Sequence, residues 1–175
     1  LYKRSGQMHM GRFAQGLALA AQRQGAQIHT RTCVQRLERV QGQVHRVHTS
    51  RGTVLASQVL LATGASRHGG YGTFGWLRRR IVPIGSFIVT TEPLGAERAH
   101  ALLAARRTYV TVANIHHYFR LTPDHRLVFG GRARFAVSSP QQDAVSGEIL
   151  RSGLAETFPQ LRDVRLDYCW GGLVD

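Results

Sequence analysis

Cysteine is rare in this sequence of 175 residues, and its two cysteines lie far apart. Neither Cys33 nor Cys169 has a second cysteine at the C-x-x-C spacing of zinc and redox sites. Because each lies in an apolar, strand-like run, we expect two buried free thiols and neither a disulfide nor a metal site. A reducing, cytoplasmic compartment is the corresponding prediction.

Long apolar runs are also absent. The apolar stretches fall short of the roughly 18 residues that span a bilayer, so we expect no membrane-spanning segment in this sequence. The opening residues LYKRSGQMHMGRF contain no apolar core like that of a secretory signal. The chain starts at Leu1 and ends in WGGLVD, and we expect it to be the central portion of a longer protein.

Lysine and acidic residues are few, which leaves arginine to set the charge. Lys3 is the only lysine, and 10 Asp and Glu oppose 23 Lys and Arg, for a formal net charge of +13. Such a charge suits a module that binds nucleic acid or another polyanion. The arginines are scattered, however, and no aromatic residues interleave with them as base stacking requires. We expect no specific nucleic-acid partner, and a basic polyanion-binding module stays as an alternative.

Histidine is plentiful but is not arranged as a set of metal ligands. The nine histidines are scattered along the chain. His116 and His117 are adjacent, so in a strand their side chains face opposite ways and cannot hold one ion together. The sequence therefore predicts no metal site.

The first third of the chain predicts a helix followed by a short strand. Residues 11–24 place Phe13 and Leu17 on one apolar helical face. Gly25 follows at the position where helices commonly stop. Residues 26–30 then predict a short strand.

A β-meander and a buried strand are expected next. Residues 33–40 read as extended, and alternating segments follow on either side of the turn SRGT at 50–53. The continuous apolar run Val59–Ala62 predicts a strand buried on both faces, as in a parallel sheet.

Residues 76–170 predict a mostly antiparallel sheet with helices. Pro123 and Asp124 form a turn signal between two strand-like segments. Strands are expected within 79–94, 107–115, 116–123, 125–135 and 164–170, and helices within 95–105 and from Ser139 onward. The second helix would begin with Pro140 at its first position and Gln142 at its third, and would bury Val145, Ile149, Leu154 and Phe158.

One glycine loop spells a nucleotide-binding motif. Gly70, Gly72 and Gly75 read G-x-G-x-x-G, and Glu92 lies downstream like a ribose-binding acid. A true fingerprint needs its glycines directly after a strand and at the start of a long helix. Here the strand ends at Ala62, and Pro83 prevents a long helix. We interpret the loop as a crossover between two subdomains.

A better nucleotide signal is LLATG at 60–64. A buried strand with this ending brings a small residue, a hydroxyl and a glycine to the carboxyl edge of a sheet, where ligands bind in open α/β folds. Gly64 has no side chain, so a cofactor can approach its backbone closely.

The chain resembles the D-amino-acid-oxidase type (DAO) family of FAD-dependent oxidoreductases, in the branch of the gamma-glutamylputrescine oxidases. The resemblance covers the chain in order. The segments that carry it are GQMHMGRFAQGLALAAQRQGAQIHTRTCV, VLLATGA, RRIVPIGSFIVTTEPL, YFRLTPDHRLVFGGRARF and FPQLRDVRLDYCWGGLVD.

This resemblance implies an α/β (α+β) fold with two domains and FAD as the cofactor. Residues 1–75 would form part of a Rossmann-like FAD-binding domain, with a helix, a strand, a β-meander, a buried strand and a loop. Residues 76–175 would form a substrate-binding domain whose end returns toward the FAD domain. The family's own G-x-G-x-x-G would precede Leu1, so this chain alone would bind FAD poorly.

The resemblance also implies site residues, carried over by position. Val34 matches the residue whose backbone meets the adenine, and Ala62, Thr63 and Gly64 match the strand end beside the cofactor. His9, with Gln7 and Met8 before it, would lie on the flavin side.

On the substrate side, Tyr118 and Arg120 would share one face of a strand. Arg120 could pair with a substrate carboxylate, and its alternative is a surface or sheet-edge arginine. Tyr118 is equally compatible with a core aromatic residue. No catalytic acid or base is assigned.

The implied reaction is oxidation of a C–N bond of a primary or secondary amine, with hydride transfer to flavin. Three positions depart from the family pattern: Met10 replaces a proline, and Thr111 and Ala113 replace an Asp and an Arg. These departures leave substrate identity open. A non-catalytic, truncated scaffold is a further alternative.

Overall fold

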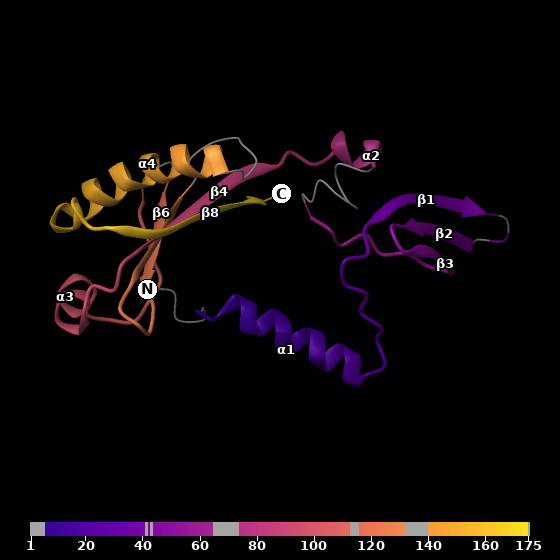
Figure 1. Cartoon of the computed structure of the whole chain (residues 1–175), viewed down its shortest axis with the longest axis horizontal. Coiled ribbons are helices and arrows are strands. Elements are labelled where there is room, and N and C mark those ends of the chain that lie inside the picture. Colours follow the sequence, from indigo (N-terminus) through magenta and orange to yellow (C-terminus); the bar gives the residue numbers. More distant parts are fainter. Residues whose placement is uncertain are drawn as a thin grey trace.

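The computed structural model describes residues 6–40, 42, 44–64, 74–112, 116–131 and 140–174. They form two antiparallel sheets with helices, and the sheets lie well apart (Figure 1). This confirms the expected mixed class with a mostly antiparallel sheet. None of the helices in these ranges is long and apolar enough to cross a membrane.

The predicted first helix is α1, which spans Met10–Arg23. Nδ1 of His9 accepts a hydrogen bond from the backbone N–H of Arg12 at 3.2 Å, so His9 caps the helix. Gly25 follows the helix with φ of +90°, which confirms its role as a stop. The apolar face of α1 is exposed, because no α1 residue is buried.

The predicted meander is the sheet of β1 (Val34–Val40), β2 (Val44–Thr49) and β3 (Gly52–Ala56), paired in that order. One face of this sheet carries an ionic cluster around Glu38. Nε2 of His48 lies 2.9 Å from the Glu38 carboxylate, and Nη1 of Arg36 lies 2.7 Å from it. The hydrogen bond to His48, together with the charge of Arg36, lowers the pKa of Glu38.

Two strand predictions in this region are wrong. Residues 26–30 are exposed and form no strand, and a turn with Arg31 at φ of +53° follows them. The run Val59–Ala62 is irregular backbone, and Leu60 is 89% exposed. A buried parallel strand needs neighbours on both sides. The sheet nearest in sequence is a meander that ends at Ala56, and no described strand pairs with 59–62.

The larger sheet has the strand order β5-β6-β7-β4-β8, and every pairing in it is antiparallel. Helix α3 (Ala96–Leu102) connects β4 to β5, and α4 (Pro140–Thr157) and the short 3₁₀ helix η1 (Pro159–Leu161) precede β8. The strands are β4 (Ile84–Thr91), β5 (Tyr109–Val110), β6 (His117–Leu121), β7 (Leu127–Gly131) and β8 (Leu166–Val174).

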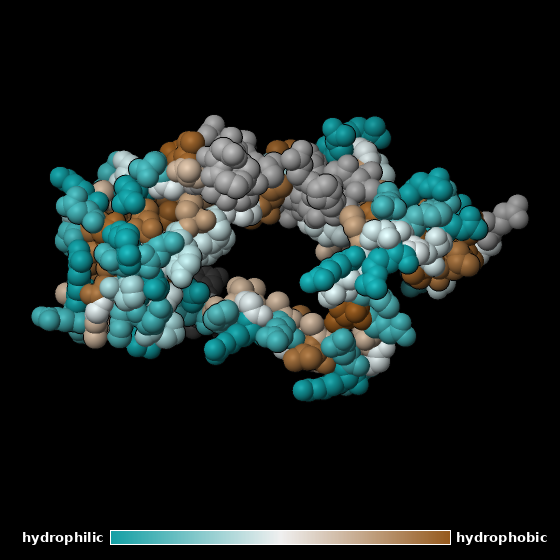
Figure 2. Space-filling view, in the orientation of Figure 1, coloured by the Kyte–Doolittle hydropathy of each residue, from teal (hydrophilic) through white to brown (hydrophobic). Residues whose placement is uncertain are grey.

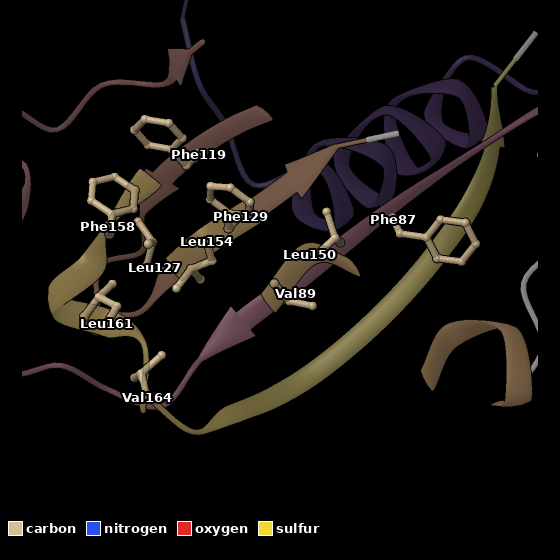
Figure 3. Close-up of a cluster of buried hydrophobic side chains, with 10 residues drawn as sticks. All are labelled: Phe87, Val89, Phe119, Leu127, Phe129, Leu150, Leu154, Phe158, Leu161 and Val164. Carbon is tan, nitrogen blue, oxygen red and sulfur yellow. The ribbon is translucent and has the colours of Figure 1, made fainter. Parts of the chain in front are cut away.

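The hydrophobic core lies between this sheet and α4. Phe87, Phe129 and Leu127 are fully buried, and Phe119 stacks on Phe129 with ring centroids 5.9 Å apart. Leu154 comes from α4. Figure 3 shows ten of the core side chains: Phe87, Val89, Phe119, Leu127, Phe129, Leu150, Leu154, Phe158, Leu161 and Val164. Helix α4 therefore covers one face of the sheet and does not cover the other face.

The expected buried face of α4 is partly wrong. Leu154 and Phe158 are buried, but Val145 and Ile149 are 47% and 42% exposed. The helix turns Leu150 to the sheet, because positions 150 and 154 are one turn apart on the same side. Its predicted cap at Ser139 lies outside the described residues.

Neither Cys33 nor Cys169 forms a disulfide among the described residues, but the predicted burial of the two thiols is not observed. Cys33 is exposed, and Cys169 is half-buried. Cys33 lies just before β1, at the end of an exposed segment, whereas Cys169 points to the α4 side of β8.

The predicted Pro123–Asp124 turn joins β6 to β7, and the side chain of Arg126 bonds the turn to the neighbouring strands. Nη1 of Arg126 donates to the Asp167 carboxylate at 2.5 Å and to the carbonyl of Thr91 at 2.9 Å. Nε of Arg126 donates to Asp124 at 2.9 Å. The hydrogen bond to Asp167 raises the pKa of Arg126. One side chain thus ties the ends of β4, β7 and β8 together.

Two adjacent glycines in β8 provide a matched test of this packing. A Cβ at Gly171 would lie 2.4 Å from Cε1 of Phe87, whereas a Cβ at Gly172 would meet nothing within 4 Å. Gly171→Ala should lower the free energy of unfolding by about 1–3 kcal/mol, because it overpacks the core. Gly172→Ala should change it by less than about 0.5 kcal/mol. Urea denaturation measures both, and equal losses would contradict the register of β8.

Acid titration tests the turn. A hydrogen bond from Thr122, with a further one from Arg126, lowers the pKa of Asp124. A lowered folded-state pKa stabilises the fold fully above the ordinary aspartate value of about 3.9, and the contribution is lost as pH falls through the folded-state value. The difference in Tm between wild type and Asp124→Asn should therefore shrink on acidification below about pH 4. Asp163→Asn, at an exposed aspartate, is the control, and a constant Asp124→Asn difference would contradict the prediction.

Candidate functional site

The face of the five-stranded sheet opposite α4 is the candidate site. Phe119 of β6 points into the core, so its neighbours Tyr118 and Arg120 lie on the other face, as the alternation predicted. Both side chains are half-buried. In Figure 1, α4 lies on one side of this sheet and α1 on the other. We name this uncovered surface the open face.

Tyr118 is held in place by two contacts on the open face. Its hydroxyl lies 2.8 Å from Oγ of Ser86 on β4, within hydrogen-bond distance. Its ring lies over Gly130 of β7, where a Cβ would come within 2.3 Å of Cε2 of the ring. The tyrosine therefore lies flat across β7 because Gly130 has no side chain.

Arg120 lies one step along the same face. Its register partner is Val128 of β7, which in turn pairs with Thr90 of β4. Within the described part of the chain, Arg120 forms no hydrogen bond or ion pair. A half-buried guanidinium in this state can pair with a carboxylate through two parallel hydrogen bonds.

Aromatic side chains of β8 extend the open face, and the sequence did not predict them as site residues. Trp170 pairs with Ile88 and Tyr168 with Thr90, so both rings share this face, and they are 46% and 59% exposed. The hydroxyl oxygen of Thr90 is buried and has no hydrogen-bond partner in the part of the chain that the structure describes. Alternation within β8 predicts that Tyr168 and Trp170 share one face, but no local pattern predicts that β8 pairs with β4.

The predicted cofactor-side residues are placed apart from this face. His9 caps α1, and Val34 begins β1. Ala62, Thr63 and Gly64 lie in exposed irregular backbone, with Gly64 at φ of +53°. No hydrogen bond among the described residues joins these three sets.

An opening separates the parts that carry these residues. Figure 2 shows it bordered by the five-stranded sheet, α1 and the meander. Gln7, just before α1, is bonded to the segment before β5: its Nε2 donates to the carbonyl of Arg106 at 3.3 Å, and its Oε1 accepts from the Thr108 hydroxyl at 3.2 Å. The opening therefore leaves both the open face and the exposed side of α1 accessible to solvent.

The glycine motif ends in structure unlike a dinucleotide loop. Gly70 and Gly72 lie outside the described residues, and Gly75 begins α2, which ends at Arg78 after four residues. Glu92 is engaged elsewhere, since its carboxylate lies 3.4 Å from Nε of Arg165. The interpretation of this segment as a crossover stays a prediction.

The histidines and acids form no metal-binding group in the described ranges, where no three His, Cys, Asp or Glu side chains converge. His117 stacks on Phe129 at 4.7 Å on the core side, whereas His116 is exposed. Of the two positions at which the chain departs from the family pattern here, Thr111 accepts a hydrogen bond from the backbone N–H of His117, and Ala113 lies outside the described residues.

Comparison with known proteins gives one family for the whole chain. Residues 1–175 match the family described as DAO, FAD dependent oxidoreductase. The chain is 33% identical over 178 residues to a probable oxidoreductase, OrdL, of Haemophilus influenzae, and 30% identical over 167 residues to gamma-glutamylputrescine oxidoreductase of Escherichia coli. The matches cover 98% and 95% of this chain but 38% of each relative.

Solved structures give the same fold. Glycine oxidase of Geobacillus kaustophilus superposes with a TM-score of 0.64 at 20% identity, over 92% of this chain and 40% of that one. Glycine oxidase of Bacillus cereus gives 0.65 at 18% identity, over 91% of this chain and 42% of that one. At these identities the likeness establishes the fold alone.

Substitutions at Gly130 and Ser86 test how Tyr118 is positioned. Gly130→Ala should displace the ring, because the new methyl group would occupy its place, and should destabilise the fold by about 1–3 kcal/mol. Ser86→Ala removes only the hydroxyl contact and should cost about 1 kcal/mol. A double-mutant cycle with Tyr118→Phe, measured by urea denaturation, should show coupling for Ser86→Ala. Strict additivity would mean that the two hydroxyls do not interact.

Proposed function

Since the chain belongs to the DAO family of FAD-dependent oxidoreductases, we propose that it supplies the substrate-facing part of an enzyme that oxidises a C–N bond of an amine or amino acid. The observation that carries the proposal is the open face. It places Arg120, which has no hydrogen-bond or ion-pair partner among the described residues, beside an anchored Tyr118 and the rings of β8, and α4 covers the opposite face. The chain spans 38% of the matched relatives, so the activity is proposed for the protein of which such a chain is part.

The domain assignment is part of this proposal. Residues 1–75 belong to an FAD-binding domain and residues 76–175 to a substrate-binding domain. The separation of the meander from the five-stranded sheet supports the division (Figure 1). The last strand, β8, runs beside β4 for nine residues and carries the chain toward the first part.

The described residues fit the ring of the cofactor better than its diphosphate. The open face offers flat aromatic and aliphatic surface of the kind that covers a flavin, from Tyr118, Ile88 and Trp170. No long helix begins at a glycine-rich turn in the described ranges, so a diphosphate cradle is not among them. Ala62, Thr63, Gly64, Val34 and His9 are the residues we propose on the cofactor side.

The division of labour follows from these positions. Bound FAD supplies the hydride acceptor for oxidation of the carbon beside the amine nitrogen. Arg120 binds the carboxylate of the substrate and fixes its orientation. Tyr118, held by Ser86, forms part of the substrate-facing surface beside Arg120 and limits access of water there. Water then hydrolyses the resulting imine to a carbonyl compound and an amine or ammonia.

A substrate like gamma-glutamylputrescine is the finer part of the proposal. The Escherichia coli relative is named for that compound and shares 30% of its residues with this chain over the matched length. Such a molecule carries both an amine and a carboxylate, which are the groups that the reaction and Arg120 require. A cytoplasmic location is proposed with it.

The first experiment is the visible spectrum of the purified protein in its full reading frame. Flavin absorbance that bleaches under anaerobic conditions when gamma-glutamylputrescine is added would support the proposal. A colourless protein that takes up no added FAD would overturn it in favour of a non-catalytic scaffold. Retention on DNA that falls steeply with salt would favour the polyanion-binding module instead.

Arg120→Gln then tests the substrate site. It should raise KM for an amine that carries a carboxylate by about tenfold or more, because a charge-assisted pair is lost. It should leave KM for a similar amine without a carboxylate nearly unchanged. Arg51→Gln, at an exposed turn arginine, is the control. An equal change in KM for both amines would show that Arg120 does not bind the carboxylate.

A further inference from the structure

A concave site lies at the far end of the five-stranded sheet. Helix α3 packs beside the turn between β6 and β7, and a cavity of about 310 Å³ opens between them. Figure 1 shows α3 at the end of the molecule away from the meander. The open face, with Tyr118 and Arg120, contributes no residue to this cavity.

The polar part of the cavity is basic. His100 of α3, Arg106 and His125 line it, and none of the described residues that line it is acidic. The side chains of these three residues form no hydrogen bond or ion pair within the described part of the chain. The nearby carboxylate of Asp124 is already bonded to Arg126. Positive groups that converge without a counter-charge favour an anionic ligand.

The backbone at His125 adds a second observation. His125 ends the turn with φ of +63°, a left-handed conformation in which glycine is the favoured residue. Its N–H donates to the carbonyl of Thr122 and its own carbonyl accepts from Leu94, so the turn is fixed. The imidazole of His125 is therefore held at the cavity although the left-handed backbone there is strained for a residue with a side chain.

Apart from Thr122, the remaining lining is apolar. Ala99 is 1% exposed, and Leu103 and Leu121 are half-buried around the same space. The cavity thus suits a small molecule with an anionic head and a short apolar body.

We propose that this cavity, the α3 pocket, binds a small organic carboxylate. Arg106 pairs with the carboxylate, His100 and His125 donate further hydrogen bonds, and the apolar body lies against Leu103 and Leu121. The pocket touches Leu121 and Thr122 at the end of β6, the strand that carries Tyr118 and Arg120. It is a site separate from the open face, and the proposal does not depend on the reaction proposed above.

Sodium butyrate is the probe, with sodium chloride at equal ionic strength as the reference. The purified protein in its full reading frame should show a saturable rise in Tm with butyrate and a matching affinity by calorimetry. Arg106→Gln and His125→Gly should each weaken that affinity by about tenfold. His125→Gly keeps the turn, because glycine accepts its conformation without strain.

Two control variants make the outcome decisive. Arg107→Gln removes an exposed arginine that does not line the pocket and should leave the butyrate affinity unchanged. Arg120→Gln distinguishes the two sites, because Arg120 lies on the open face and does not line the pocket. Loss of butyrate binding in Arg120→Gln alone would place the carboxylate on the open face and overturn the proposal. An equal rise in Tm with butyrate in all variants, or an equal rise with chloride, would overturn it as well.

Discussion

The packing of α4 against one face of the five-stranded sheet is the interaction on which the rest of the structure depends. It buries Phe87, Phe129 and Leu154 and so supplies most of the hydrophobic stabilisation of the chain. Side chains alternate along a strand, so each residue of β6 that points into the core makes its two neighbours point to the opposite face. The burial of Phe119 is therefore what turns Tyr118 and Arg120 outward. The direction of the side chains on the open face thus follows from burial on the other face.

The sequence allowed prediction where a local signal decides the structure. Pro123 and Asp124 fix a turn whatever surrounds them, and alternation placed Tyr118 and Arg120 together. Prediction failed where distant partners decide. The apolar run Val59–Ala62 is a strand only if neighbours pair with it, and none of the described strands does. Likewise, the rings of β8 join the site through a pairing with β4 that no local pattern specifies.

The strong arginine bias has a structural use that its net charge conceals. Several guanidinium groups donate to backbone carbonyls that regular structure leaves unpaired. Arg98 reaches the carbonyl of Gln160, Arg151 that of Val164, and Arg126 that of Thr91. A guanidinium can serve a carbonyl and carboxylates at once, as Arg126 does, which an ammonium group does less well. Positive charge in this chain is thus partly committed to internal links.

The order of the strands has a consequence for synthesis. β4 lies between β7 and β8, and β8 is the last of the five described strands of this sheet in chain order. Until residues 166–174 emerge, the backbone groups along that side of β4 have no partner and form an exposed edge. Such an edge is a template for wrong pairing between nascent chains. The long antiparallel pairing of β4 with β8 makes completion of the sheet a late, non-local event, and folding of this part should be slow relative to the β6–β7 hairpin.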